Sequence, residues 1–271
     1  MRLKNTYSTL DLYATKGRRW ELKMKNMGLK NFKRKAVALC LSFAIALGTL
    51  LTPVAAYAAA TNPATELDGE LSPIYQGNVG DCGAISAIQA LDNSVYGKGL
   101  LRTMITVNSN RTYTLNFGSG KVTVTQKEVD AAHVTGDLDA RVIEVALQKV
   151  MNVYNGCFSC DVFTTMTGFK QKTSYGGSSK TSTINALAAK FASGQGAMAA
   201  CDFTIADPSK GIIGDGGHSY SIRWVDEEIV VVINPWDTSK LIYMSRSQFE
   251  NSIRYMTYVD ESAKKVVVYW D

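Results

Sequence analysis

The sequence is poor in the residues on which several classes of function depend. Its 271 residues include two histidines and five cysteines. The one Cys-x-x-Cys pair, Cys157 and Cys160, has no second pair at the spacing of a zinc site. It also lacks the strand and helix that surround a thioredoxin-like redox pair. Neither kind of site is favoured, and we expect no metal and no cofactor.

Long apolar runs are almost absent, and the single one lies close to the N-terminus. It covers 16 residues, 36–51, follows the basic stretch 31–35, and precedes a small-x-small sequence at 56–58. A membrane-spanning helix needs about 20 apolar residues, whereas this order of basic, apolar and small residues is typical of a secretory signal peptide. We expect cleavage after Ala58, a secreted, extracellular product, and no membrane anchor afterwards.

The basic character of the chain comes from its leader. Residues 1–58 hold 11 of the 29 Lys and Arg but only 2 of the 24 Asp and Glu, which leaves 18 basic and 22 acidic residues in the remainder. After cleavage the net charge is therefore about −4 instead of +5. This balance gives no support for a nucleic acid or an anionic membrane as partner.

The chain divides into three parts by composition. A leader with a signal peptide covers 1–58, a turn-rich connecting segment covers 59–75, and one domain covers 76–271. Because an exported chain can keep disulfides, we expect a bridge between Cys157 and Cys160, or from either of them to Cys201. The sequence leaves that choice open.

Periodicity places helices before strands in the domain. Apolar residues recur at helical spacing over 82–91, with Asp81 as the predicted N-cap, and again over 137–154. Residues 168–182, rich in Gly, Ser, Lys and Thr, predict an exposed loop or linker. The other predicted elements are a hairpin of 112–117 and 121–125, helices at 184–191 and 248–255, and strands at 198–205, 218–225, 228–234, 241–244 and 265–270. Segregated helices and antiparallel strands indicate an α+β fold of two lobes with a cleft between them.

Cys82 begins the first helix and is the candidate nucleophile. A thiol in the first turn of a helix lies at the positive end of the helix dipole, which favours the thiolate. We therefore expect its pKa to be lowered. A single free cysteine is more often buried and inert, so this interpretation depends on residues further along the chain.

The two histidines have different settings. His133 lies beside acidic residues and before a Thr-Gly break, where a structural role is expected. His218 follows the loop Gly-Asp-Gly-Gly and opens an alternating strand, and the next strand ends at Asn234, opposite His218 in an antiparallel hairpin. Asn234 is thus placed to fix the imidazole tautomer, and Trp236 to cover the hydrogen bond. Nucleophile, base and orienting group are the parts of a catalytic triad.

Three short motifs follow one another along the chain: Gln-Gly-x-x-Gly-Asp-Cys at 76–82, Gly-His-Ser-Tyr-Ser-Ile at 217–222, and Asn-Pro-Trp at 234–236. Together they resemble the calpain-type group of papain-fold cysteine proteases. With a looser likeness over 139–168, the resemblance covers most of 73–238. It implies a papain-like fold of two lobes, with a helical lobe carrying the Cys helix and an antiparallel β lobe carrying the His and the Asn.

The resemblance also implies a role for each matched residue. Cys82 would be the nucleophile, His218 the acceptor and later the donor of its proton, and Asn234 the group that orients His218. The side chain of Gln76, with the backbone N–H of Cys82, would stabilise the oxyanion. The implied function is that of a secreted cysteine endopeptidase, which hydrolyses peptide bonds of proteins through an acyl-enzyme. Its partner would be a protein or peptide substrate, and nothing in the sequence identifies an inhibitor.

Departures from the family leave other functions open. Gly83 stands where the family usually has Trp, and Asp237 where it usually has Gly. Gly83 also fits the Gln-x4-Asp-Cys-Gly pattern of bacteriocin-leader-processing peptidases, which share the papain fold. A transglutaminase-like acyltransferase would use the same Cys and His, and a non-catalytic papain-fold binding module would need neither. The calcium sites of calpains do not transfer, because the chain has no matching acidic loop and no EF-hand pattern, so the sequence leaves calcium dependence open.

Overall fold

The computed structural model describes residues 66–175 and 178–262, all within one compact unit that spans 60–271. The leader with its predicted signal peptide and the predicted strand at 265–270 lie outside the described residues. Within those two ranges, no helix has both the length and the apolar character that crossing a membrane requires.

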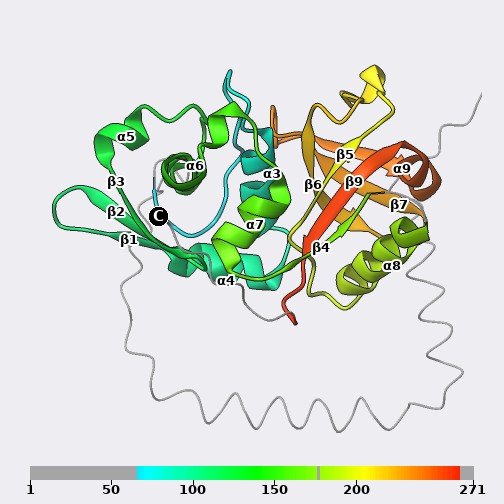
Figure 1. The fold of residues 1–271 in the computed structure, drawn as a ribbon, viewed down its shortest axis with the longest axis horizontal. Helices are drawn as coiled ribbons and strands as arrows, with labels where there is room; N and C mark the ends of the chain where they lie inside the picture. Colours follow the sequence, from blue (N-terminus) through cyan, green and yellow to red (C-terminus); the bar gives the residue numbers. More distant parts are fainter. Residues whose placement is uncertain (1–65, 176–177, 263–271) are drawn as a thin grey trace, which may run out of the picture. The chain divides into compact units, whose positions relative to one another are not determined.

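The fold is of the α+β class, with seven helices and two antiparallel sheets in the described ranges (Figure 1). The smaller sheet has the order β1-β2-β3 and the larger the order β4-β9-β5-β6-β7-β8. The helices are α3 Cys82–Leu91, α4 Val95–Met104, α5 Gln126–Asp130, α6 Leu138–Met151, α7 Ser159–Thr167, α8 Ser178–Ala192 and α9 Arg246–Ser252. The strands are β1 Ile105–Val107, β2 Thr112–Phe117, β3 Gly120–Thr125, β4 Gln171–Ser174, β5 Ala199–Phe203, β6 Ser219–Val225, β7 Ile229–Ile233, β8 Leu241–Ser245 and β9 Ile253–Val259.

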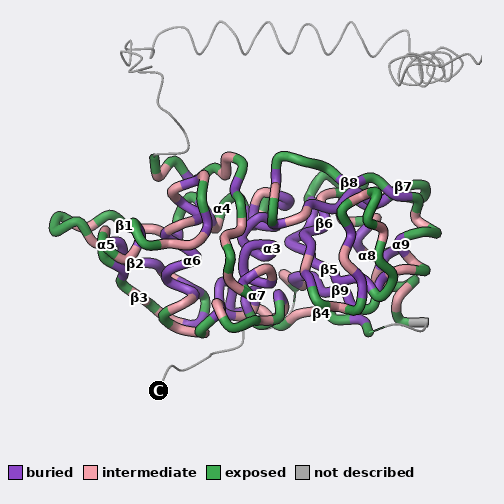
Figure 2. The backbone as a smooth tube through the Cα atoms, turned by 90° about the horizontal axis from the view of Figure 1, so that it is seen from above, coloured by how far each residue is buried: buried purple, intermediate pink, exposed green. Residues whose placement is uncertain are grey.

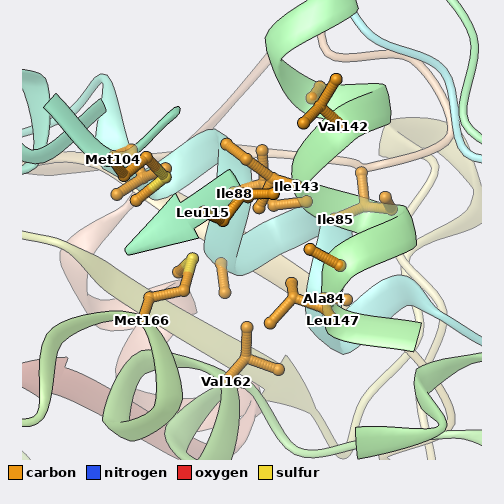
Figure 3. Packing of buried hydrophobic residues seen from close by; sticks show 14 of the residues in the cluster. Ala84, Ile85, Ile88, Met104, Leu115, Val142, Ile143, Leu147, Val162 and Met166 are labelled. Atoms are coloured by element: carbon orange, nitrogen blue, oxygen red, sulfur yellow. The ribbon is translucent and has the colours of Figure 1, made fainter. Parts of the chain in front are cut away.

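Helix α3 lies at the centre of the first of two hydrophobic clusters. It contacts α4, α6 and α7, and on its other side strand β6 of the larger sheet (Figure 1). Ile85 and Ile88 pack among Ile143 and Leu147 of α6 and Val162 of α7 (Figure 3). After its first residue the helix is buried on every side, and not along one stripe only (Figure 2). Each fully buried side chain of this size contributes about 1.5–3 kcal/mol, so α3 is a firm support for the residue at its start.

The second hydrophobic cluster belongs to the six-stranded sheet. Ile184, Leu187 and Phe191 of α8 and Phe249 of α9 pack with the buried residues of its strands. Tyr220 of β6 is fully buried there. The chain therefore builds one cluster around α3 and another on the larger sheet, and these meet where α3 contacts β6.

Much of the predicted element order is confirmed. Helix α3 has the predicted bounds, β2 and β3 form the predicted hairpin, and β5 to β8 occupy the four described strand predictions within a few residues. Helix α6 begins after Asp137, whose side chain accepts from the Ala140 N–H at 3.0 Å, and Lys149 lies in its last turn. An acidic start and a basic end suit the helix dipole.

Two predictions for the second half were wrong. Residues 168–182 are not one exposed loop, because β4 occupies 171–174 and α8 begins at Ser178. Residues 253–255 do not continue a helix but begin β9, which pairs with β5 and β4. In both places the predicted element is replaced by a strand whose partners lie far along the chain, and such pairing does not follow from local periodicity.

The expected disulfide is also wrong. The cysteines of the described residues, Cys82, Cys157, Cys160 and Cys201, are all free thiols. Cys157 lies against α3, with its sulfur 3.1 Å from the position a Cβ would take at Gly83, whereas Cys160 lies in the first turn of α7 beside Asp161. Cys201 is fully buried in β5.

Candidate active site

Cys82 and His218 line the same cavity, which has a volume of about 590 Å³. Cys82 is the first residue of α3, and His218 immediately precedes β6. Contact between α3 and β6 thus brings together two residues that are far apart in sequence. The rest of the wall includes Gly156, Phe158, Asp161, Asp202, Gly217 and Tyr255. A cavity of this size is in the range of sites that bind small ligands or peptide segments.

The surroundings of Cys82 oppose the predicted lowering of its pKa. Burial raises the pKa of the half-buried thiol above its usual 9.0, and the carboxyl of Asp81 acts in the same direction. The backbone N–H groups of Ser219 and Gly83 act to lower it, but burial is the larger effect. The prediction of a resting thiolate is therefore wrong in direction, because the desolvation of the sulfur outweighs its position at the helix N-terminus.

Asp81 stands at the N-cap of α3 but does not cap the helix with its side chain. Its backbone oxygen accepts from the N–H groups of Ala84 and Ile85, at 2.8 and 3.0 Å, while its carboxylate makes no capping hydrogen bond. Both carboxylate oxygens are buried, and the carboxyl hydrogen-bonds to the side chains of Glu144 and Gln76 instead of the helix N-terminus. The predicted side-chain cap is therefore wrong, because the Asp81 carboxyl is paired with that of Glu144.

Asp81 and Glu144 form a sealed carboxyl pair, since both residues are 0% exposed. The two oxygens of Glu144 accept from the backbone N–H groups of His133 and Val134, each at 3.1 Å. Burial, and after it the Asp81 carboxyl, raise the pKa of Glu144 to about 8. Burial likewise raises the pKa of Asp81. The pair therefore holds a proton at neutral pH, beside the residue that carries the thiol.

His218 and Asn234 interact as the sequence predicted. Nε2 of His218 lies 2.9 Å from Oδ1 of Asn234. The amide of Asn234 is itself oriented, because its nitrogen donates to the Gly211 oxygen at 3.2 Å and its oxygen accepts from the Trp236 N–H at 3.0 Å. An amide oxygen facing the ring requires that Nε2 carry the proton, which leaves the lone pair on Nδ1.

The imidazole of His218 is covered and largely desolvated. The Trp236 ring lies over it with centroids 4.6 Å apart, and the Tyr220 ring meets it edge-on at 4.9 Å. Burial lowers the pKa of His218 below 6.5, and the hydrogen bond to Asn234 acts in the opposite direction. At neutral pH the ring is therefore uncharged and can accept a proton at Nδ1.

Gln76 is held near these residues but does not line the cavity in the part of the chain that the structure describes. Its backbone N–H donates to the oxygen of Pro235 at 2.8 Å, which ties the segment before α3 to the end of β7. Its side-chain nitrogen donates to the Val79 oxygen at 2.9 Å. Of the four predicted site residues, the structure thus brings Cys82, His218 and Asn234 together and leaves the Gln76 amide beside them.

Three serines connect the two halves of the site. The hydroxyls of Ser86 in α3, Ser159 in α7 and Ser219 in β6 form a closed ring of contacts at 2.8, 2.8 and 3.0 Å. The oxygen of Gly83 also lies 3.2 and 3.0 Å from the hydroxyls of Ser86 and Ser159, so each of these serines donates its single proton either to Gly83 or within the ring. Because Ser219 follows His218 directly, this serine ring fixes the histidine relative to α3.

Gly83 has a steric reason to be glycine. A Cβ at this position would lie 2.1 Å from the backbone oxygen of Cys157, closer than real contacts allow. The segment after α6 therefore approaches the start of α3 so closely that no larger residue fits. This accounts for one of the two departures from the calpain pattern.

His133 was expected to be structural. It lies outside the cavity wall formed by the described residues, and its ring is edge-on to that of Tyr154, with centroids 4.7 Å apart.

Other residues of the site gave no signal in the sequence. The serine ring, Glu144 and the acidic residues of the cavity were not predicted, because each acts through a partner far along the chain. A smaller cavity of about 270 Å³, beside Asn93 and Trp224, has no cysteine or histidine in its wall among the described residues. In the comparisons with known proteins, no family model matches this chain and no curated sequence is significantly similar to it.

Proposed function

We propose that this chain is a secreted cysteine endopeptidase with a papain-like fold of the calpain type. The observation that carries the proposal is the joint placement of Cys82 and His218 in one cavity, with His218 oriented by Asn234 at 2.9 Å. The α+β fold with two hydrophobic clusters supports a papain-like arrangement of two lobes. Secretion rests on the signal-peptide pattern within 1–58, outside the described residues.

The proposed mechanism starts from a neutral thiol and a neutral imidazole. As the sulfur of Cys82 attacks the peptide carbonyl carbon, Nδ1 of His218 takes the thiol proton, and the carbonyl electrons move onto oxygen. Collapse of this intermediate breaks the C–N bond, and the leaving amine takes the proton from His218. Water, deprotonated by the same nitrogen, then hydrolyses the thioester. The backbone N–H of Cys82, with the amide of Gln76 when it swings from Val79, would donate to the oxyanion.

The first test of this function compares two thiols of the same cavity. Cys82→Ala should abolish cleavage of an unfolded protein and labelling by an epoxide thiol probe. Cys157→Ala should leave labelling intact, because burial raises the pKa of Cys157 to about 12 and keeps that thiol unreactive. Cleavage that persists in Cys82→Ala overturns the proposal.

The pH profile of kcat/KM supplies a second readout. Activity should rise as His218 loses its proton, with a midpoint below 6.5, and fall as Cys82 loses its proton, with a midpoint above 9.0. A single acid limb near pH 4, unaffected by changes at His218, would indicate a carboxylate as the base instead.

Acyl transfer to an amine, the reaction of a transglutaminase, uses the same thioester. Mass spectrometry of the products separates the two reactions, since hydrolysis yields shorter peptides and transfer yields cross-linked ones. Gly83 does not favour a leader-processing peptidase over a calpain-type enzyme, because the Cys157 carbonyl accounts for it.

A further inference from the structure

If Cys82 cleaves peptides as proposed above, the cavity beside it determines which peptides bind. Two carboxylates line this cavity, Asp161 from α7 and Asp202 from β5, and no lysine or arginine of the described residues lines it with them. Asp161 is exposed, and its carboxylate forms no ion pair within those residues. The wall next to the nucleophile is thus acidic.

Asp202 is almost fully buried, and only one of its two carboxylate oxygens accepts a hydrogen bond. It is 6% exposed, its Oδ2 accepts from Nη2 of Arg254 at 3.0 Å, and its Oδ1 has no hydrogen-bond partner. A buried carboxylate oxygen without a donor is unfavourable, and most such atoms in proteins have one. On a cavity wall, a bound ligand can supply that donor.

A β-bulge determines how Asp202 is presented. Asp202 pairs with Tyr255 and Phe203 pairs with Ile253, so Arg254 is the extra residue of β9. Directly opposed residues of antiparallel strands project from the same face, and Asp202 and Tyr255 both line the cavity. The bulge lets Arg254 reach one oxygen of Asp202 without itself entering the wall.

Aromatic rings adjoin these carboxylates. The Tyr255 ring lies 5.1 Å from that of Tyr175 and 6.4 Å from that of Phe158, measured between centroids. Tyr175 is 74% exposed and Phe158 58% exposed, so both rings are open to a ligand. Aromatic faces beside carboxylates are the surroundings that cations prefer, and a planar guanidinium most of all.

We propose that the peptide substrate carries a basic side chain, arginine in preference to lysine, which binds between the Tyr255 ring and the carboxylates of Asp161 and Asp202. Arg254 offsets the negative charge of one carboxylate, and the basic side chain of the substrate offsets that of the other. The incoming guanidinium donates to Oδ1 of Asp202 while Arg254 keeps Oδ2.

The test uses the purified full-length protein and a quenched-fluorescent peptide library. One position at a time is arginine, lysine, leucine, glutamate or citrulline, the neutral isostere of arginine. At the position that binds in the cavity, kcat/KM for arginine should exceed that for citrulline about 30-fold, as expected for a charge-assisted contact. Asp161→Asn and Asp202→Asn should each reduce this ratio to about 3-fold or less. Glu227→Gln, an exposed acid in the β6–β7 turn, should keep the full ratio.

The outcomes separate this inference from the proposed function. Equal rates for arginine and citrulline at every position, or faster cleavage with leucine or glutamate, overturn the basic preference and leave Cys82-dependent cleavage standing. An arginine-to-citrulline ratio that stays undiminished in Asp161→Asn also overturns the basic preference. Asp161→Asn keeps the test valid if Asp202→Asn misfolds. If no peptide is cleaved in a Cys82-dependent way, the proposed function itself fails.

Discussion

Two pairs of acidic side chains lie close to the candidate nucleophile, and they differ in access to the cavity. Asp81 and Glu144 are fully buried and hydrogen-bonded to each other, with a shared proton at neutral pH. Asp161 and Asp202 line the cavity, and a basic residue of the protein pairs with only one of them. Carboxylates close to the same cysteine can therefore differ in what they act on. The sealed pair acts on the protein itself, through its stability and the thiol pKa, and we propose that the open pair, Asp161 and Asp202, acts on the peptide that enters the cavity.

The largest expected effect is a loss of stability with rising pH, caused by the sealed pair. The pKa of Glu144 is raised from 4.5 to about 8 in the folded state, so its stabilising contribution is complete below pH 4.5 and is lost as the pH rises through 8. The free energy of unfolding should fall by roughly 3–5 kcal/mol over this range, measured by urea unfolding at pH 5 and pH 8. Asp81→Asn should reduce the difference. An unchanged difference in that variant would assign the effect to other buried carboxyls.

The second prediction compares the two pairs directly at neutral pH. Glu144→Ala leaves the N–H groups of His133 and Val134 without acceptors, and should lower the free energy of unfolding by roughly 2–4 kcal/mol. Asp161→Ala, in the open pair, should change the free energy of unfolding by less than about 0.5 kcal/mol. Urea titrations followed by tryptophan fluorescence measure both. Similar losses in the two variants would remove the distinction between the pairs.

The smallest effect concerns the thiol. Asp81 raises the pKa of Cys82, so Asp81→Asn should shift the pH dependence of alkylation by iodoacetamide to lower pH. Asp161→Asn is the matched control from the open pair, because Asp161 is not among the groups that act on the Cys82 pKa. A shift in the control as large as in Asp81→Asn would show that both pairs act on the sulfur.

Local sequence was enough to predict the parts of the site that depend on neighbours in the chain. The helix behind Cys82 follows from its apolar residues, and the contact of His218 with Asn234 follows from a short hairpin. The direction of the Cys82 pKa did not follow, because the burial of its sulfur comes from segments such as 156–158 that pack against α3.

Long-range pairing explains the remaining differences. Asp81 has the residue type and position of an N-cap, but its carboxyl hydrogen-bonds to Glu144 of another helix. Strand β9 is stabilised by β5 and β4, and its bulge, which sets Asp202 beside Tyr255, depends on register and not on composition. Such features arise only once the whole sheet has assembled.

The serine ring has a consequence for when Cys82 could act as proposed. Its members come from α3, α7 and β6, so it closes only after the first hydrophobic cluster has docked against the larger sheet. Before that point Cys82 lacks its base, and its thiol is an unassisted nucleophile. If Cys82 acts as proposed, a chain that has not completed its fold would therefore be inert toward its neighbours, and proteolysis would begin only with the last step of its own assembly.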